Sequence, residues 1–295
     1  MGCVPSKFKE NSASMDSQSS QTEEFRYIDG RRYHNEENVG YHLPNDDEET
    51  DRLHEQHFIM KYIWQSNFSA PVEHILSKSG AKILDVGYPL SKVIGLDIST
   101  HQPTQIKPKN FEFVKANAQE GLPFDDNTFD FVFQRYLIAG YNKEKWQYVI
   151  NEIVRVLKPG GYLELCEPSN PFDNGPVSRR IFMSEVEIFE EKGCDIDIYE
   201  KLDDYLQNQG QVENIKKEAK KIYYNAKHSN DIGLSKALVG STMNTLVSLK
   251  PLLTKKMEIS NKEYDKLAKM VEKELIELDF YLIVVRIYAN KVIDK

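Results

Sequence analysis

Cysteines, long apolar runs and a secretory leader are scarce or missing in this sequence of 295 residues. The three cysteines, Cys3, Cys166 and Cys194, fit neither a disulfide framework nor a zinc site, so we expect a reducing compartment and no metal. No apolar run approaches the ~18 residues of a membrane-spanning helix, since the longest candidate, 280–285, ends at Arg286. The first 24 residues lack the apolar core of a secretory signal, which favours a cytoplasmic location.

An excess of positive charge is absent as well. The chain carries 38 Lys and Arg residues against 46 Asp and Glu residues, a net charge of −8, so we expect no nucleic-acid partner. Hydrophobic residues make up 40% of the chain and aromatic residues 11%, enough for a sizeable core. The length suits one large domain or two small ones.

The first seven residues, MGCVPSK, fit the pattern for N-myristoylation. Gly2 would carry the first acyl chain, and Cys3 stands where a palmitoyl chain is often added; two chains together give stable membrane anchoring. Residues 10–24 are rich in Ser and Gln and predict disorder. We therefore expect residues 1–24 to tether the protein to the cytosolic face of a membrane. The alternative is a Met-Gly start that arose by chance.

Alternating strands and helices follow this tether. The Asp29-Gly30 pair predicts a short hairpin, residues 44–68 predict a helix capped by Asn45, and a second short helix is expected at 71–78. Apolar runs at 81–87, 92–98, 111–117 and 129–134 are typical of strands buried on both faces. Residues 142–157 have helical spacing, KPGG ends this helix, and the next strand is expected at 162–168. This alternation predicts a parallel sheet with helices on its faces.

The C-terminal part of the chain predicts more helices and two strands. Residues 177–192 predict a helix, and a further helix, a turn at Gly210 and a strand follow. Amphipathic helices are expected at 231–250 and 260–278, with Pro251 breaking the chain between them. The β-branched and aromatic run at 279–292 predicts the last strand.

Four segments, 83–87, 93–99, 116–133 and 154–168, resemble class I S-adenosylmethionine (SAM)-dependent methyltransferases. LPFDDNTFDFV followed by VLKPGG is a fairly specific pair, and the likeness is greatest to the small-molecule branch that includes ubiquinone-biosynthesis-like enzymes. The resemblance implies an α/β fold: a Rossmann-like, doubly wound, mostly parallel sheet with an antiparallel last strand and helices on both faces. It covers a core of 45–168 within an expected domain of 25–295, which the helices and strands of 177–295 complete.

The resemblance also implies which residues bind SAM. Asp97 would accept both ribose hydroxyls, as an acid at this position does in dinucleotide folds. The alternative is that Asp97 and Asn117 only cap strand ends. The full set that the resemblance implies is Asp85, Gly87, Asp97, Ile98, Asn117, Ala118, Gln134 and Arg135.

Within this set, Ile98, Asn117 and Ala118 correspond to positions around the adenine ring. Gln134 and Arg135 correspond to a segment near the methionine moiety and the acceptor. The acceptor pocket is expected beneath the late helices, and the residues that we expect to line it are Tyr136, Tyr141, Trp64 and Met183.

One segment departs from the family pattern. In the family, the first strand continues into a glycine-rich loop and a helix, and the helix N-terminus favours the SAM carboxylate. Here Gly87 is followed by YPLSK, and the next strand begins at Val93, so the first crossover helix is missing. An in-frame loss, by alternative splicing or a gene-model error, is our hypothesis for this join. We expect an uncovered sheet face, lower stability and SAM binding weaker than micromolar.

Two functions remain open on the sequence alone. The first is SAM-dependent methyl transfer to an unidentified small-molecule or lipid-like acceptor, impaired by the truncated loop. The second is a non-catalytic, membrane-tethered pseudoenzyme or scaffold of methyltransferase ancestry. Asp97 and the segment 116–124 favour the first function, and the short link after Gly87 favours the second.

Overall fold

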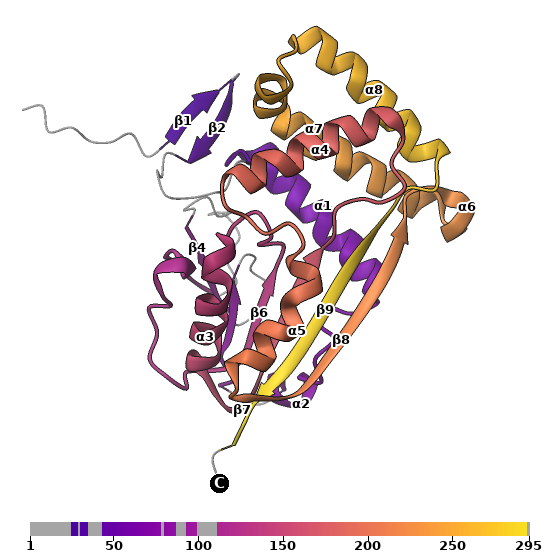
Figure 1. The fold of residues 1–295 in the computed structure, drawn as a ribbon. Helices are drawn as coiled ribbons and strands as arrows, with labels where there is room; N and C mark the ends of the chain where they lie inside the picture. The colour runs from indigo at the N-terminus through magenta and orange to yellow at the C-terminus, as the bar shows by residue number, and fades with distance from the viewer. Residues whose placement is uncertain are drawn as a thin grey trace, which may run out of the picture.

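A seven-stranded sheet forms the centre of the fold (Figure 1). The computed structural model describes residues 25–28, 30–34, 43–77, 80–86, 93–98 and 111–293. The strand order in the sheet is β5-β4-β3-β6-β7-β9-β8. The strands are β3 (Ile83–Val86), β4 (Val93–Asp97), β5 (Glu112–Lys115), β6 (Phe129–Arg135), β7 (Leu157–Pro168), β8 (Val212–Tyr223) and β9 (Tyr281–Lys291).

The direction of the strands confirms the expected doubly wound topology. From β5 to β7, each strand pairs in parallel with its neighbour. The last strand, β9, inserts between β7 and β8 and is antiparallel to both. A mostly parallel sheet with an antiparallel last strand is therefore what the chain forms.

Helices cover both faces of the sheet and one of its ends (Figure 1). On one face lies α1 (Asp47–Trp64), and on the other lie α3 (Trp146–Val156) and α5 (Ile198–Gln209). Three longer helices, α4 (Pro176–Glu191), α7 (Ile232–Met257) and α8 (Asn261–Glu277), gather beyond the end towards which β8 points. The remaining elements are the hairpin β1 (Phe25–Ile28) and β2 (Arg31–His34), the short helices α2 (Glu73–Leu76) and α6 (Ala226–Ser229), and the 3₁₀ turns η1 (Ala118–Glu120) and η2 (Lys143–Lys145).

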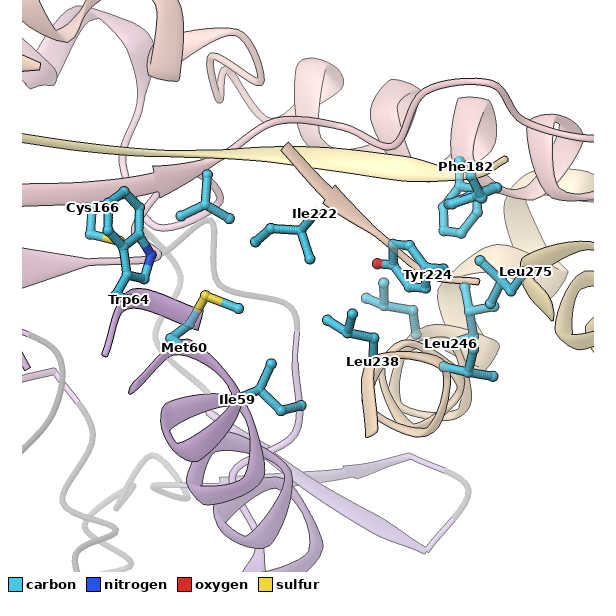
Figure 2. Packing of buried hydrophobic residues seen from close by; sticks show 14 of the residues in the cluster. Ile59, Met60, Trp64, Cys166, Phe182, Ile222, Tyr224, Leu238, Leu246 and Leu275 are labelled. Carbon is cyan, nitrogen blue, oxygen red and sulfur yellow. The ribbon is translucent and has the colours of Figure 1, made fainter. Parts of the chain in front are cut away.

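Two hydrophobic cores stabilise these layers, one on each face of the sheet. The first joins α1 and the late helices to the sheet; Figure 2 shows Met60 and Trp64 of α1 near Cys166, and Tyr224 near Leu246. In the second core, Trp146, Ile150 and their neighbours on α3 pack against α5 and against the other face of the sheet. Strands with apolar residues on both faces are what a sheet between two helical layers requires.

Most of the expected elements are present, but four details differ. Asp46 rather than Asn45 caps α1, because its carboxylate accepts from Glu49 N at 3.1 Å, and α1 ends at Trp64. Pro251 does not break the chain: α7 continues through it, and Leu249 and Leu253 on either side are buried. Packing in the core therefore outweighs the lost backbone hydrogen bond of the proline.

The fourth difference is the start of β7, which precedes KPGG instead of following it. The pairing of β7 with β6 begins at Leu157 and shifts between Phe129 and Phe131, so a bulge accommodates KPGG. Glycines suit this bulge, since Gly160 has a φ of +77° and a Cβ on Gly161 would lie 2.9 Å from the Lys158 carbonyl.

The short link between β3 and β4 does not alter their pairing. Ile83 to Val86 align in parallel with Val93 to Leu96. Going back from Val86 to Val93 needs ~11 Å, and the seven intervening steps reach ~23 Å when extended, so the link has ample length. The link suffices because the paired segments are only four residues long.

The uncovered sheet face that we expected is not seen for the described apolar side chains. A helix between β3 and β4 would cover the α1 face, because right-handed crossovers place the helices of the two halves of the sheet on opposite faces and α3 lies on the other face. Ile83, which packs in the core on the α1 face, is buried. The ring of Phe111 covers β4, since a Cβ on Gly95 would lie 2.9 Å from its Cζ atom. The expectation of a solvent-exposed apolar face is therefore wrong for these residues.

Several predictions concern residues outside the described ranges. These are the tether 1–24 with Gly2 and Cys3, Gly87, and the link residues 88–92. Among the helices that the structure describes, none combines the length and the apolar character that crossing a bilayer requires.

Candidate functional site

Three neighbouring parallel strands bring polar side chains to one edge of the sheet. Asp97 is the last residue of β4, Arg135 is the last residue of β6, and Asp85 lies one residue before the end of β3. The register aligns Asp85 with Gly95 on one side and with Phe133 on the other. Ligands of open α/β sheets bind at this carboxyl edge, where the strand order reverses.

The pleat of the sheet divides these residues between its two faces. Because side chains alternate along a strand, Asp85, Asp97 and Arg135 share the face that α1 covers. Gln134 points to the opposite face, towards α3. The edge therefore presents charged groups on the α1 face and an amide on the other face.

A cavity lies between α1 and the charged face of the sheet, and we call it the α1 cavity. Its walls come from α1, from the segment that follows α1, and from β3, β6 and β9. The lining residues are His57, Met60, Lys61, Ser66, Asn67, Phe68, Asp85, Phe133, Arg135 and Arg286.

Arg135 is oriented in this cavity by His57. Its Nη1 lies 3.0 Å from His57 Nδ1, and its guanidinium carbon lies 6.0 Å from the centre of the Phe133 ring. Burial, followed by the charges of Arg135 and Lys61, lowers the pKa of His57 to about 4. His57 is thus neutral at physiological pH and can accept a hydrogen bond from Arg135.

Gln134 is completely buried on the opposite face of the same strand. Its Oε1 accepts from the hydroxyl of Tyr141 at 3.1 Å. Its Nε2 has no hydrogen-bond partner among the residues that the structure describes. A buried amide donor without a partner costs free energy, so this group is suited to a bound ligand.

Comparisons with known proteins indicate a methyltransferase domain. A profile described as "Methyltransferase domain" matches residues 78–165. Methyltransferase pytC of Aspergillus terreus is 32% identical over 191 residues, which cover 59% of this chain and 56% of pytC. The chain carries a class I SAM-dependent methyltransferase domain.

Other relatives match shorter stretches. N-methyltransferase verN of Clonostachys rogersoniana is 30% identical over 143 residues, 43% of this chain and 50% of verN. Demethylmenaquinone methyltransferase of Bacillus cereus is 37% identical over 87 residues, 27% of this chain and 35% of the bacterial protein. The chain spans about half the length, or less, of the curated relatives that it matches.

Solved structures resemble the domain at low identity. Phosphoethanolamine N-methyltransferase 2 of Haemonchus contortus, in complex with SAM, gives a TM-score of 0.47 at 20% identity, with 80% of this chain and 56% of that chain covered. The [4+2]-cyclase SpnF gives a TM-score of 0.44 at 15% identity, with 84% of this chain and 97% of SpnF covered. The strand order of its sheet defines the fold of the methyltransferase domain.

The edge residues of the methyltransferase domain fit SAM in the polar groups that they offer. The unpartnered Nε2 of Gln134 is a donor at the end of β6, and Asp85 and Asp97 supply carboxylates at the ends of β3 and β4. Gly87 lies outside the described residues, and Ile98 is half-exposed directly after Asp97.

Asn117 and Ala118 lie after β5 and have structural contacts. The side chain of Asn117 accepts from Gln119 N at 3.0 Å and donates to Glu120 at 3.1 Å, so it caps η1. Ala118 is buried in the core beside α3. Asn117 therefore has a capping role, but it caps η1 and not the end of β5, which is Lys115.

The four residues expected to line an acceptor pocket do not gather in one place. Trp64 contacts two cations, with the Arg286 guanidinium carbon 4.5 Å and Lys220 Nζ 4.6 Å from the centre of its ring. Tyr141 packs on the α3 face, whereas Tyr136 belongs to the α1 face. Met183 is exposed on α4.

Sequence reasoning missed two buried acids on β7. Glu167 accepts from Leu137 N and Ile138 N at 3.0 Å each, which fixes the turn after β6. Glu164 accepts from Ser69 N and Ala70 N at 2.7 Å each. Burial raises the pKa of Glu167 to about 8 and that of Glu164 to about 7. Acids within the apolar run YLELCEP were the available signal.

Proposed function

We propose that the domain binds SAM at the carboxyl edge of β3, β4 and β6 and transfers its methyl group to a small-molecule acceptor. The observation that carries this proposal is the convergence of Asp85, Asp97 and Arg135 at the reversal of strand order, within the matched methyltransferase domain. The acceptor class is supported by relatives whose names are those of small-molecule methyltransferases, such as demethylmenaquinone methyltransferase.

Each edge residue has a proposed role. Asp97 accepts hydrogen bonds from the ribose hydroxyls, Ile98 packs on the adenine ring, and Asp85 faces the polar end of the cofactor. Gln134 donates through its buried Nε2. SAM supplies an activated methyl group on its sulfonium, and the protein contributes by holding donor and acceptor in line at attack distance.

Calorimetry with SAM and the Asp97→Asn variant tests this proposal. We expect at least a tenfold loss of SAM affinity, ~1.4 kcal/mol, because the amide accepts fewer ribose hydrogen bonds. Asp204→Asn, on the exposed side of α5, is the matched control and should bind as the wild type does. A wild type that neither binds SAM nor transfers a labelled methyl group would leave the non-catalytic scaffold as the better description.

We also propose the tether and the domain boundaries on sequence grounds. Residues 1–24 would carry acyl chains on Gly2 and Cys3, and residues 25–295 would form the domain that they anchor. Metabolic labelling with a myristate analogue should tag the wild type and not the Gly2→Ala variant. An unlabelled wild type with its native N-terminus would contradict acylation.

A further inference from the structure

Arg286 of β9 is a buried cation that lines the α1 cavity, with 3% of its surface exposed. The hydrogen bonds of its Nη atoms to the chain are long: Nη1 lies 3.4 Å from Ser66 Oγ, and Nη2 lies 3.5 Å from the Ser66 carbonyl oxygen. Its Nε has no hydrogen-bond partner in the described part of the chain. A guanidinium carries five N–H donors, and ordinary N–H···O bonds measure about 2.9 Å. Arg286 therefore has donors that a ligand in the cavity can use.

Glu164 of β7 balances the charge of Arg286 without lining the cavity itself. It is completely buried, its Oε1 lies 3.6 Å from Arg286 Nε, and its Oε2 accepts from two backbone amides at 2.7 Å each. Glu218 stands opposite Arg286 on β8, but it is exposed and lies 4.0 Å from Lys220. Since the buried cation already faces a buried anion, a neutral hydrogen-bond acceptor suits Arg286 better than a second anion.

Trp64 at the end of α1 orders this guanidinium. The guanidinium carbon lies 4.5 Å from the centre of the indole ring. A planar guanidinium over an aromatic ring is attracted by the face of the ring, and it loses little conformational freedom on binding because it is ordered beforehand. Arg286 is thus held by the ring of Trp64 and by the carboxylate of Glu164.

Aromatic and apolar side chains form another part of the cavity wall. Phe68 stands edge-on to Phe133 with the ring centres 5.0 Å apart, and Met60 belongs to the same lining. With its open mouth the cavity measures about 500 Å³, which is room for a small aromatic molecule. Small-molecule sites combine such walls with a few polar groups that fix orientation. The lining therefore suits a flat apolar body that carries a polar group.

A carbonyl group has the properties that Arg286 and its surroundings require. Its oxygen accepts without donating, has two lone pairs in one plane and carries no net charge. We propose that the α1 cavity binds a neutral, flat small molecule through a carbonyl oxygen that accepts from Arg286, with Phe68 and Phe133 against its apolar body. That this molecule is the methyl acceptor rests on the proposed function, whereas its binding does not.

The first experiment compares acetophenone with α-methylstyrene, the isostere in which a CH₂ group replaces the carbonyl oxygen. Both are titrated into the full chain without SAM and followed by NMR. The titrations are made at about pH 8.5, because burial raises the pKa of Glu164 to about 7 and its carboxylate has to be ionised. We expect acetophenone to bind at least tenfold more tightly, because the CH₂ group leaves the donors of Arg286 unpaired.

Variants of Arg286 identify the donor. Arg286→Lys keeps a cation beside Glu164 but lacks the planar fork, so it should lose most of the preference for acetophenone. Glu164→Gln combined with Arg286→Met removes both buried charges together, which avoids an unpaired charge, and this double variant should bind the two probes equally. Arg180→Lys, at an exposed position of α4, is the matched control and should keep the wild-type ratio.

Benzoate tests the charge balance. In Glu164→Gln the cation of Arg286 has no buried anion beside it, so the affinity for benzoate relative to acetophenone should rise severalfold over the wild type. The other charged groups of the lining are the same in both proteins, so their effects cancel in this comparison. Glu272→Gln, on the exposed side of α8, is the control and should leave the ratio unchanged. An unchanged ratio in Glu164→Gln as well would contradict the balancing role of Glu164.

The two tryptophans of the chain report where the probe binds. Trp64 lies against Arg286, whereas Trp146 is buried in the core on the other face of the sheet. In the wild type, acetophenone should shift the indole NMR signal of Trp64, identified by its absence in Trp64→Phe, and should leave the signal of Trp146 in place. This measurement needs no variant of Arg286, so it tests the location even if those variants fail to fold.

Three results would overturn the proposal. The wild type shows no preference for acetophenone over α-methylstyrene, the signal of Trp64 does not move, or Arg180→Lys changes the ratio of affinities as much as Arg286→Lys does. A wild type that binds acetophenone at Trp64 but transfers no methyl group would contradict the proposed function alone and leave this carbonyl site in place.

Discussion

Glu167 fixes the turn between β6 and the segment that leads to α3. Its two oxygens accept from the consecutive amides of Leu137 and Ile138, beside Tyr136 with its left-handed φ of 55°. In Glu167→Gln, one amide would face an NH₂ group, which leaves a buried donor unsatisfied. We expect a loss of ~1–3 kcal/mol in the free energy of unfolding by chemical denaturation.

Glu272→Gln on the exposed side of α8 is the matched control for this prediction, and its stability should equal that of the wild type. If Glu167→Gln were as stable as the control, the two amide hydrogen bonds would contribute nothing to the turn.

The buried acids of β7 also predict how stability depends on pH. Burial raises the pKa of Glu164 from 4.5 to about 7 and that of Glu167 from 4.5 to about 8. A raised pKa in the folded state means a contribution that is complete below pH 4.5 and is lost as pH rises through these values. The free energy of unfolding should therefore fall between pH 5 and pH 8, by at most ~1.4 kcal/mol per pH unit for each group. The free energy of unfolding is measured from denaturation curves at several pH values in this range. It should depend less on pH in Glu167→Gln than in the wild type.

Single residues were predictable where a local motif contained them. The family pattern predicted Asp85, Asp97 and Gln134 at or next to the ends of strands, and the structure has them there; their binding of SAM stays a prediction. His57 and Arg135 are 78 positions apart, and no local pattern reports that they meet. Their contact depends on how α1 lies across the sheet, which is a property of the whole fold.

At the scale of elements, a carboxylate from one helix caps another. Glu274 of α8 accepts from Val177 N at 3.1 Å and Ser178 N at 2.7 Å in the first turn of α4. Gly175 precedes this turn, and a Cβ there would collide with the Glu274 carboxylate. We expect Gly175→Ala to displace this cap and to cost ~1–2 kcal/mol of stability, measured by denaturation.

Gly240→Ala is an informative comparison for this prediction. Gly240 lies inside α7, and the nearest atom to its Cβ would be Glu55 Oε1 at 3.9 Å, an ordinary contact. This variant should gain ~0.5–1 kcal/mol, because alanine loses less conformational entropy in a helix. Destabilisation of both variants to the same degree would show that any added methyl group is harmful and that the cap at Gly175 is not special.

The existence and type of the long elements could be predicted from periodicity, but their ends could not. The cap of α1 moved by one residue, and α7 continued through Pro251. In both cases, contacts between distant segments decide the outcome. Arg31 on β2 binds the Asp46 carboxylate, with 2.6 Å between its Nε and Asp46 Oδ2. The apolar face of α7 is buried against α8 and α1.

At the scale of the whole molecule, the strand order followed from the alternation of strands and helices together with the family resemblance. The short link between β3 and β4 leaves that order intact, because the parallel pairing of these strands needs little chain length. The cover over this face could not be predicted, since Phe111 and the segment after α1 reach it from other parts of the chain.

This cover changes what repair of the link should achieve. Insertion of a glycine-rich loop and helix of about 16 residues between Gly87 and Tyr88 would restore an ordinary crossover. Because the inserted helix N-terminus supplies amide donors, SAM affinity should improve from weaker than micromolar by at least tenfold, ~1.4 kcal/mol, in calorimetry. Because Ile83 on the α1 face is already buried and the Phe111 ring covers Gly95, the melting temperature should change little. A Gly/Ser insert of the same length is the control and should not improve affinity. If the helical insert does not improve the affinity either, the absence of this helix is not what limits SAM binding.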